Sequence, residues 1–173
     1  MRKIVKNPRK GTLIWITGLS GSGKTSLAHS LKNYVENKNK NWMVLSGDDI
    51  RKNLELTRFD KVSRLKYALL YSKICKKITD RNINIIFSTV SLFKKVRSWN
   101  KKNIDNYLEI YIKSNIQTLI GKKQKFFYRK KLKNIVGKNI EAEFPKNPDI
   151  VIENNFKKSL KTLSGELIKK INF

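Results

Sequence analysis

Cysteine and histidine are almost missing from this chain of 173 residues, which contains one of each. The single cysteine, Cys75, cannot form an internal disulfide, as is usual for cytoplasmic proteins, and no Cys/His cluster is available to hold a structural metal. The apolar runs are a few residues long, whereas a membrane-spanning helix needs roughly 20 apolar residues. No apolar segment of a signal peptide follows the basic start of the chain. We therefore expect a cytoplasmic protein without membrane segments.

Acidic residues are also few, because 13 Asp and Glu stand against 39 Lys and Arg, for a formal net charge of +26. Such an excess is typical of proteins that bind nucleic acid or another polyanion. However, lysine outnumbers arginine by 31 to 8, and Lys, Asn and Ile together supply 69 of the 173 residues. Arginine, the better bidentate ligand of phosphate, is scarce. We attribute the charge mainly to a compositional bias and to a small phosphate-rich substrate, and expect no nucleic-acid partner.

The order of apolar and amphipathic segments predicts the fold class. A length of 173 residues with 39% hydrophobic residues is typical of one globular domain, here 1–173. Strand signals alternate with helix signals, and strands joined by helical crossovers form a parallel sheet with helices on both faces. We therefore expect an α/β fold. The expected strands are 13–17, 42–46, 83–88, 107–112 and 150–152, and the expected helices are 26–35, 60–80 (capped by Asp60), 93–103 and a last one near 160–171.

A basic segment at 122–138 has no regular periodicity, and it contains eight Lys or Arg and no acid. Long irregular segments inside a compact domain are commonly active-site lids or binding loops. We expect a basic lid in this region. The alternative is a solvated loop without a function.

One segment has a sharply defined chemistry, because it matches the phosphate-loop pattern G-x-x-x-x-G-K-[ST] at every defined position. It lies between an apolar strand and an amphipathic helix, where backbone N–H groups and the helix N-terminus can surround a phosphate chain. Lys24 is expected to neutralise the β- and γ-phosphates of a nucleoside triphosphate, and the Thr25 hydroxyl to bind Mg²⁺. The expected nucleotide-binding residues are Gly18, Leu19, Ser20, Gly21, Ser22, Gly23, Lys24 and Thr25.

An acidic residue, Asp48, follows the second expected strand. Because the carboxyl ends of parallel strands face the ligand, Asp48 can hold Mg²⁺, orient an acceptor hydroxyl and accept its proton. Arg51, one helical turn later, can hold an acceptor phosphate. The alternative is that Asp48 or Asp49 only caps a short helix. A GTPase is not expected, because no N-K-x-D motif is present. Small size, a lid and this acid favour a small-molecule kinase.

Two of these segments, 15–25 and 45–51, resemble the adenylyl-sulfate kinase family. The similarity continues through 90–93, close to the family's I-S-P-[FY], 125–130, close to K-G-L-Y-K-K, and 145–149, close to P-E-N-P-[DE]. The resemblance implies a P-loop kinase fold with a five-stranded parallel sheet, helices on both faces and a basic lid. It also implies transfer of phosphate from ATP, with Mg²⁺, to the ribose 3′-hydroxyl of adenylyl sulfate. Because family members are commonly dimers, a homodimer is one assembly to test.

The chain departs from this family around the acceptor. Ser46 replaces the first Asp of the family's L-D-G-D, whereas the second Asp remains as Asp48. The Arg and Asn that hold adenylyl sulfate in the family fall on Lys61 and Arg64 of this chain. The same small molecule is therefore not expected to be held in the same way.

The two phenylalanines that sandwich adenine in the family fall on Leu56 and Ile135. Aromatic stacking is worth about 1–3 kcal/mol per base, so the loss of both rings predicts weak adenine binding. A second resemblance fits this change, through the spacing Ser88-x-x-Ser91-x-Phe93-x-x-x-Arg97-x-Trp99-Asn100 and the segment 134–137. Both are similar to kinases of bacterial capsule clusters, which include cytidine diphosphoramidate kinase. The resemblance implies 3′-phosphorylation of cytidine diphosphoramidate for capsular polysaccharide decoration.

These comparisons of motifs imply a complete set of site residues. The expected catalytic residues are Lys24, Asp48 and Ser91. Ser91 matches a family serine described as a phosphorylated intermediate, but direct transfer needs no such intermediate, so we favour a substrate-binding or structural role for it. The expected acceptor-binding residues are Arg51, Leu56, Lys61, Arg64, Val90, Ser91, Lys125, Arg129 and Ile135, and the expected metal ligands are Thr25 and Asp48.

Three alternatives stay open at this point. The first is an adenylyl-sulfate kinase that makes 3′-phosphoadenylyl sulfate. The second is a kinase that acts on a sugar or a polynucleotide end. The third belongs to another class, a non-catalytic P-loop protein that binds RNA or another polyanion. The intact set of Lys24, Thr25, Asp48 and Arg51 argues against the third.

Overall fold

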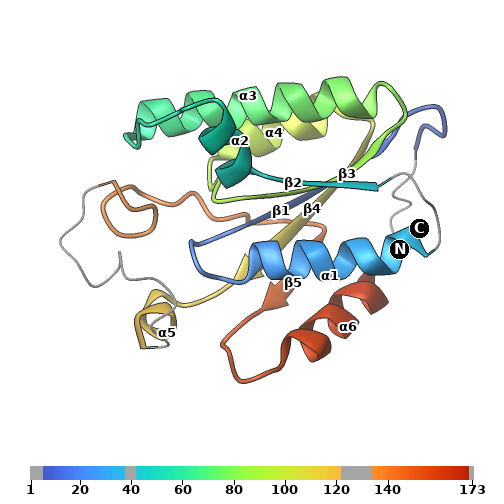
Figure 1. Ribbon diagram of the computed structural model, residues 1–173. Coiled ribbons are helices and arrows are strands. Elements are labelled where there is room, and N and C mark those ends of the chain that lie inside the picture. Colours follow the sequence, from blue (N-terminus) through green and yellow to red (C-terminus); the bar gives the residue numbers. More distant parts are fainter. Residues whose placement is uncertain (1–5, 38–41, 122–133, 172–173) are drawn as a thin grey trace.

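The central sheet has five strands, all parallel, in the order β2-β3-β1-β4-β5 (Figure 1). The computed structural model describes residues 6–37, 42–121 and 134–171. Every expected strand is confirmed, and no observed bound differs from the expected one by more than one residue. The strands are β1 (Thr12–Gly18), β2 (Trp42–Ser46), β3 (Asn84–Thr89), β4 (Asn106–Lys113) and β5 (Ile150–Glu153).

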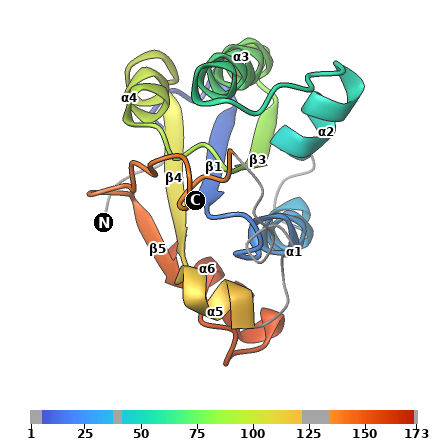
Figure 2. The ribbon, with the colours of Figure 1, turned by 90° about the vertical axis from the view of Figure 1, so that its left-hand side faces the viewer.

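Helices cover both faces of the sheet, which confirms the expected α/β fold (Figures 1 and 2). Helices α1 and α6 pack on one face, and α3 and α4 pack together on the other. No helix of the described residues is long and apolar enough to cross a membrane. The helices are α1 (Lys24–Glu36), α2 (Gly47–Asn53), α3 (Lys61–Thr79), α4 (Lys94–Asn103), α5 (Ile116–Gly121) and α6 (Leu160–Lys170). Helix α5 was not expected from the sequence, and α2 appeared there only as the short helix that Asp48 or Asp49 could cap.

The central strand β1 supplies both layers of the core. Its side chains alternate between the faces, as the pleat of a strand requires. Ile14 and Ile16 pack in the cluster beneath α1 and α6, whereas Leu13 and Trp15 pack in the cluster beneath α3 and α4. All four residues are fully buried. This is why the strand is a continuous apolar run, as expected for a parallel sheet that is covered on both faces.

Helix α3 begins at the cap that the sequence predicts. The Asp60 carboxylate accepts hydrogen bonds from the backbone N–H of Ser63 at 2.9 Å and from its hydroxyl at 2.7 Å. These two bonds lower the pKa of Asp60, because they stabilise the charged form. The cap fixes the start of α3 and therefore the direction in which its first turns face.

A third apolar cluster lies at the carboxyl ends of the strands and joins three segments that are distant in the sequence. Leu19 of the phosphate loop, Leu92 and Ile135 are all buried in it. Gly137 has a φ of 86°, and a Cβ there would lie 2.7 Å from Leu19 Cδ2, so the turn at 135–140 fits closely over the loop. The first twelve residues of the expected lid, 122–133, lie outside the described residues.

Candidate active site

A cleft of about 770 Å³ lies where β1 and β3 end, on the left of the sheet in Figure 1. The phosphate loop and the start of α1 form one end of the cleft. Helix α2, the first turns of α3 and residues 134–136 form the other end. Ligands bind at this edge of open parallel sheets. The expected site residues that line the cleft are Ser20, Gly21, Gly23, Lys24, Thr25, Asp48, Arg51, Arg64, Val90, Ser91 and Ile135.

The phosphate loop is braced by a residue from the far end of the chain. Gly23 has a φ of 90° where the loop turns into α1, a conformation that favours glycine. The side-chain amide of Asn154, just after β5, donates a hydrogen bond to the Ser22 carbonyl at 3.0 Å. No local pattern marks Asn154 as a partner of the loop, because Ser22 and Asn154 are 132 positions apart in the chain. Gly18, Leu19 and Ser22 are buried and do not line the cleft.

Lys24 and Thr25 lie at the start of α1 and line the cleft. The Lys24 side chain folds over the loop, and its Nζ donates a hydrogen bond to the Leu19 carbonyl at 2.6 Å. Phosphate oxygens would be stronger acceptors for this ammonium than a neutral carbonyl, because they are charged. Thr25 is exposed at the first turn of α1 and lines the cleft.

The carboxylate of Asp48 faces the cleft and is not used as a helix cap. Ser46 caps α2 instead: its Oγ accepts from the backbone N–H of Asp49 at 3.1 Å and donates to Asp49 Oδ2 at 2.6 Å. The alternative that Asp48 only caps a helix is therefore wrong, and Asp49 belongs to the cap. Asp48 is 76% exposed and pairs with Arg51, whose Nη2 lies 2.6 Å from Asp48 Oδ1. This pair brings a carboxylate and a guanidinium together at the mouth of the cleft.

A second guanidinium, that of Arg64, lies at the same end. Arg64 donates from Nε to the Phe59 carbonyl at 2.8 Å and from Nη2 to the Asn134 carbonyl at 3.0 Å. Burial lowers the pKa of Arg64, and the nearby charge of Arg51 lowers it further. Two positive charges held this close together make an electrostatic site for an anion.

Some expected acceptor residues lie elsewhere. Leu56 does not line the cleft and packs half-buried against the cluster beneath α3 and α4. Lys61 is exposed on the first turn of α3, also outside the lining. Neither side chain reaches the cleft in this structure, because Leu56 packs inward and Lys61 faces solvent, so their contact with the acceptor stays a prediction. Lys125 and Arg129 fall outside the described residues.

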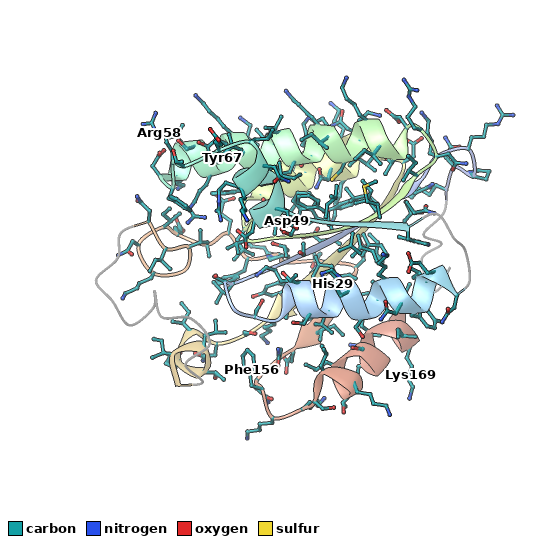
Figure 3. All side chains as sticks on the ribbon, in the orientation of Figure 1. His29, Asp49, Arg58, Tyr67, Phe156 and Lys169 are labelled. Atoms are coloured by element: carbon teal, nitrogen blue, oxygen red, sulfur yellow. The ribbon has the colours of Figure 1, made fainter. Side chains whose placement is uncertain are left out.

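One face of α3 carries the expected Arg64 together with three residues that the sequence reasoning missed. Arg64, Tyr67, Ala68 and Tyr71 line the cleft together, at the spacing of three and four that defines one face of a helix. Figure 3 shows Tyr67 and Arg58 at this end of the molecule. This spacing is visible in the sequence and was the signal that could have identified Tyr67, Ala68 and Tyr71.

Two buried hydroxyls also border the cleft. The Oγ atoms of Ser88 and Ser91 have no hydrogen-bond partner among the described residues, and the two residues are 3% and 1% exposed. Buried hydroxyls normally find partners. Polar atoms of a ligand in the cleft would supply them.

Only some residues of the motif Ser88-x-x-Ser91-x-Phe93-x-x-x-Arg97-x-Trp99-Asn100, which carries the second resemblance, line the cleft. Ser88, Ser91 and Phe93 line the cleft, but Arg97 and Asn100 lie on the buried face of α4, away from it. Arg97 Nε lies 3.2 Å from the buried Glu109 Oε1. Burial raises the pKa of Glu109, and the charges of Lys101 and Arg97 oppose this shift. Arg97 therefore compensates a buried charge and does not contact the acceptor.

The glycine loop between a parallel strand and a helix, together with the carboxylate across the cleft, defines a P-loop phosphotransferase. The adenylylsulphate kinase family model matches residues 10–153. The chain is 36% identical to the cytidine diphosphoramidate kinase of Campylobacter jejuni, over 92% of this chain and 95% of that protein. It is 30% identical to the adenylyl-sulfate kinase of Clostridium kluyveri, over 85% and 77% of the two chains.

Solved structures agree with these sequence comparisons. The APS kinase CysC of Mycobacterium tuberculosis, in complex with AMPPNP and APS, superposes with a TM-score of 0.81. The match covers 93% of this chain and 97% of that one, at 24% identity, and it shows the shared fold. The protein therefore belongs to the adenylylsulphate kinase family and is an ATP-dependent kinase.

Proposed function

We propose that this kinase transfers the γ-phosphate of ATP to the ribose 3′-hydroxyl of cytidine diphosphoramidate. One observation carries the acceptor end of the proposal: Asp48, Arg51 and Arg64 lie together at the end of the cleft opposite the phosphate loop. A carboxylate can receive a hydroxyl proton, and two guanidiniums can hold a diphosphate-like anion. A nucleotide acceptor carries both a ribose hydroxyl and a diphosphate-like anion.

In this mechanism the phosphate loop holds the triphosphate of ATP through its backbone N–H groups and Lys24. The oxygen donors of Thr25 and Asp48 fit Mg²⁺, which prefers hydroxyl, carboxylate and phosphate oxygens and would neutralise charge on the phosphates. Both side chains line the same cleft. Positioning and charge neutralisation supply most of the rate in phosphoryl transfer.

Asp48 orients the 3′-hydroxyl and accepts its proton as the new oxygen–phosphorus bond forms. The bond between the γ-phosphorus and the bridging oxygen breaks, and ADP leaves. Without the acceptor, Asp48 pairs with Arg51. An anionic acceptor competes for Arg51, which frees the carboxylate for the hydroxyl. Ser88 and Ser91 are available to hydrogen-bond the sugar or the transferring group, and this agrees with a substrate-binding role for Ser91.

The two positions that hold the adenine sandwich in the family, Leu56 and Ile135 of this chain, favour a small base over adenine. Ile135 lines the cleft where the family has a ring, and Leu56 lies outside the lining. Neither position therefore offers the aromatic sandwich that purine stacking uses. The relative with 36% identity over nearly its whole length is a kinase of the cytidine compound.

Adenylyl sulfate is the second candidate acceptor, because several other relatives are adenylyl-sulfate kinases. The two candidates share the ribose hydroxyl and a 5′ anion of two linked acid groups. They differ in the base and in the terminal group. The choice therefore depends on the acceptor end of the cleft and not on the phosphate loop.

The decisive experiment offers each acceptor separately with ATP and Mg²⁺, measures ADP release, and locates the new phosphate by phosphorus NMR. We expect a higher kcat/KM for cytidine diphosphoramidate and a product phosphorylated at the 3′ position. A higher kcat/KM for adenylyl sulfate would instead assign the protein to the second candidate. Turnover of neither compound would overturn both acceptors and leave the kinase class unchanged.

A further inference from the structure

The ring of Phe59 contacts both arginines of the acceptor end. The guanidinium carbon of Arg51 lies over this ring at 4.7 Å from its centroid, and that of Arg64 lies over it at 5.3 Å. Phe59 stands just before the cap of α3, lines the cleft and is 43% exposed.

Each of the two arginines also forms an ion pair or hydrogen bonds with other residues. Arg51 is paired with Asp48 on α2, whereas Arg64 is bonded to the carbonyls of Phe59 and Asn134. Phe59 is thus the one residue, among those the structure describes, whose ring joins the α2 arginine to the α3 arginine. The two like charges repel each other; the carboxylate of Asp48 offsets part of this repulsion, and the ring of Phe59 is the second contact that the two guanidiniums share.

The chemistry of this arrangement suits an anion with two charged groups. A benzene ring attracts cations to its face and thereby offsets part of the repulsion between the guanidiniums. An anion with oxygens on two linked acid groups can accept hydrogen bonds from both guanidiniums at once. The protein therefore has the cation pair in place before the acceptor binds, which lowers the ordering cost of binding.

We propose that Phe59 is a positioning residue that holds Arg51 and Arg64 at the spacing required to bind the diphosphate part of the acceptor. This inference rests on the proposed function, in that the acceptor carries a diphosphate-like anion. It differs from a role as a stacking platform for the base. Two guanidiniums already lie over the ring, so little of its face is left for a base.

The test compares Phe59→Leu, which keeps the apolar bulk and removes the π face, with Phe59→Tyr, which keeps the ring. The matched control is Phe144→Leu, because Phe144 is 44% exposed, packs against the ring of Tyr111 and does not line the cleft. Calorimetry measures the binding of inorganic pyrophosphate to each protein after the phosphate loop is saturated with a non-hydrolysable ATP analogue and Mg²⁺. This readout needs no turnover, so it is independent of which nucleoside the enzyme accepts.

Loss of two cation–π contacts should raise the pyrophosphate Kd by about 5- to 30-fold in Phe59→Leu. Phe59→Tyr should stay within about twofold of the wild type, as the ring is retained. The Phe144→Leu control and the affinity for the ATP analogue should not change. In turnover assays the acceptor KM should rise in Phe59→Leu with little change in kcat.

Two results would overturn the inference. One is pyrophosphate binding that is unchanged in Phe59→Leu. If the acceptor KM nevertheless rose in that variant, the ring of Phe59 would stack on the base of the acceptor instead of positioning the arginines. The other is a wild-type protein that binds no pyrophosphate at all. Failure of the wild type to phosphorylate the cytidine compound, with the pyrophosphate effect intact, would overturn the acceptor identity alone.

Discussion

At the scale of single residues, Asp48 and Asp49 show how adjacent carboxylates receive different roles. Both follow β2, and both are compatible in sequence with catalysis or with capping. The hydroxyl of Ser46 engages Asp49, which leaves the exposed carboxylate of Asp48 at the mouth of the cleft beside Arg51. The role of each acid is therefore decided by a third side chain that precedes both.

We predict that Asp48→Asn lowers kcat by about 10²- to 10⁴-fold, the usual contribution of a general base. The amide keeps the shape of the side chain but cannot accept the hydroxyl proton. Nucleotide affinity should be largely retained, because Lys24 and the loop backbone hold the phosphates. Steady-state kinetics and titration with a fluorescent ATP analogue measure the two effects. Asp49→Asn is the matched control and should keep most of the activity, whereas near-normal turnover in Asp48→Asn would remove its assigned role.

Residues matched by motif alone do not all reach the site. Leu56 and Lys61 align with substrate-binding positions of the family, yet Leu56 packs against the helix cluster from the segment before α3, and Lys61 faces solvent on the first turn of α3. Arg97 and Asn100 share the spacing of the capsule-type kinases, yet they lie on the buried face of α4, where Arg97 neutralises Glu109. A linear motif gives spacing along the chain, and the rotation of each helix decides which members face the ligand.

At the scale of elements, α2 determines where Asp48 is held, and its only side-chain cap is Ser46. We predict that Ser46→Ala lowers the free energy of unfolding by about 0.5–2 kcal/mol, the usual cost of losing an N-cap. Turnover should fall as well, because the first turn of α2 carries Asp48. Chemical denaturation and steady-state kinetics measure the two effects. Ser46→Thr should preserve both, since its hydroxyl can still accept from the Asp49 backbone N–H and donate to the Asp49 carboxylate.

The control for this prediction is Ser159→Ala. Ser159 caps α6 in the same way, accepting from the Thr162 backbone N–H at 3.1 Å, but α6 packs on α1 and β5 and does not line the cleft. It should cost a similar amount of stability and leave kcat unchanged. If Ser46→Ala lost stability but kept full kcat, the cap would have no part in placing Asp48.

Strands and long helices could be predicted from the sequence because each carries its own periodic signal. The five strands are short apolar runs, and α1, α3, α4 and α6 show apolar residues at helical spacing. Helices α2 and α5 have seven and six residues, too few to show a period, and their formation depends on the strands that they follow. The phosphate loop was predictable for a related reason, since its chemistry is local to eight residues.

The acceptor end was less predictable because it is assembled from distant segments. Arg51, Phe59 and Arg64 come from α2, the segment before α3 and α3 itself, and Ile135 arrives from the far side of the expected lid. The Asn154 amide that braces the loop comes from the end of β5. Only the order of the strands brings these groups together. Side-chain contacts such as the two guanidiniums over one ring cannot be recognised from the amino-acid composition or from the periodicity of the sequence.

At the scale of the whole molecule, the net charge of +26 is spread over several sides. Exposed lysines lie on α3 and α4 on one face of the sheet and on α6 on the other, and Lys169 lies far from Arg58 in Figure 3. A nucleic-acid site normally gathers its basic residues on one face or stripe. For the described part of the chain, this arrangement supports a compositional origin of the charge, with Lys24, Arg51 and Arg64 among the cations that line the cleft.

We predict that RNA inhibits the kinase at low salt and has little effect near 0.15 M salt. Scattered lysines bind polyanions non-specifically, with a typical Kd of about 10⁻⁴–10⁻⁶ M at physiological salt, and this binding weakens steeply as salt rises. The cleft, by contrast, binds a small anion through directed contacts, so acceptor KM should depend less on salt. Kinase assays with micromolar RNA at about 0.02 M and 0.15 M salt measure both trends. Inhibition that persists at 0.15 M and is relieved by excess acceptor would contradict the prediction, because the RNA would then occupy the Arg51 and Arg64 site, and the excess charge would have a function of its own.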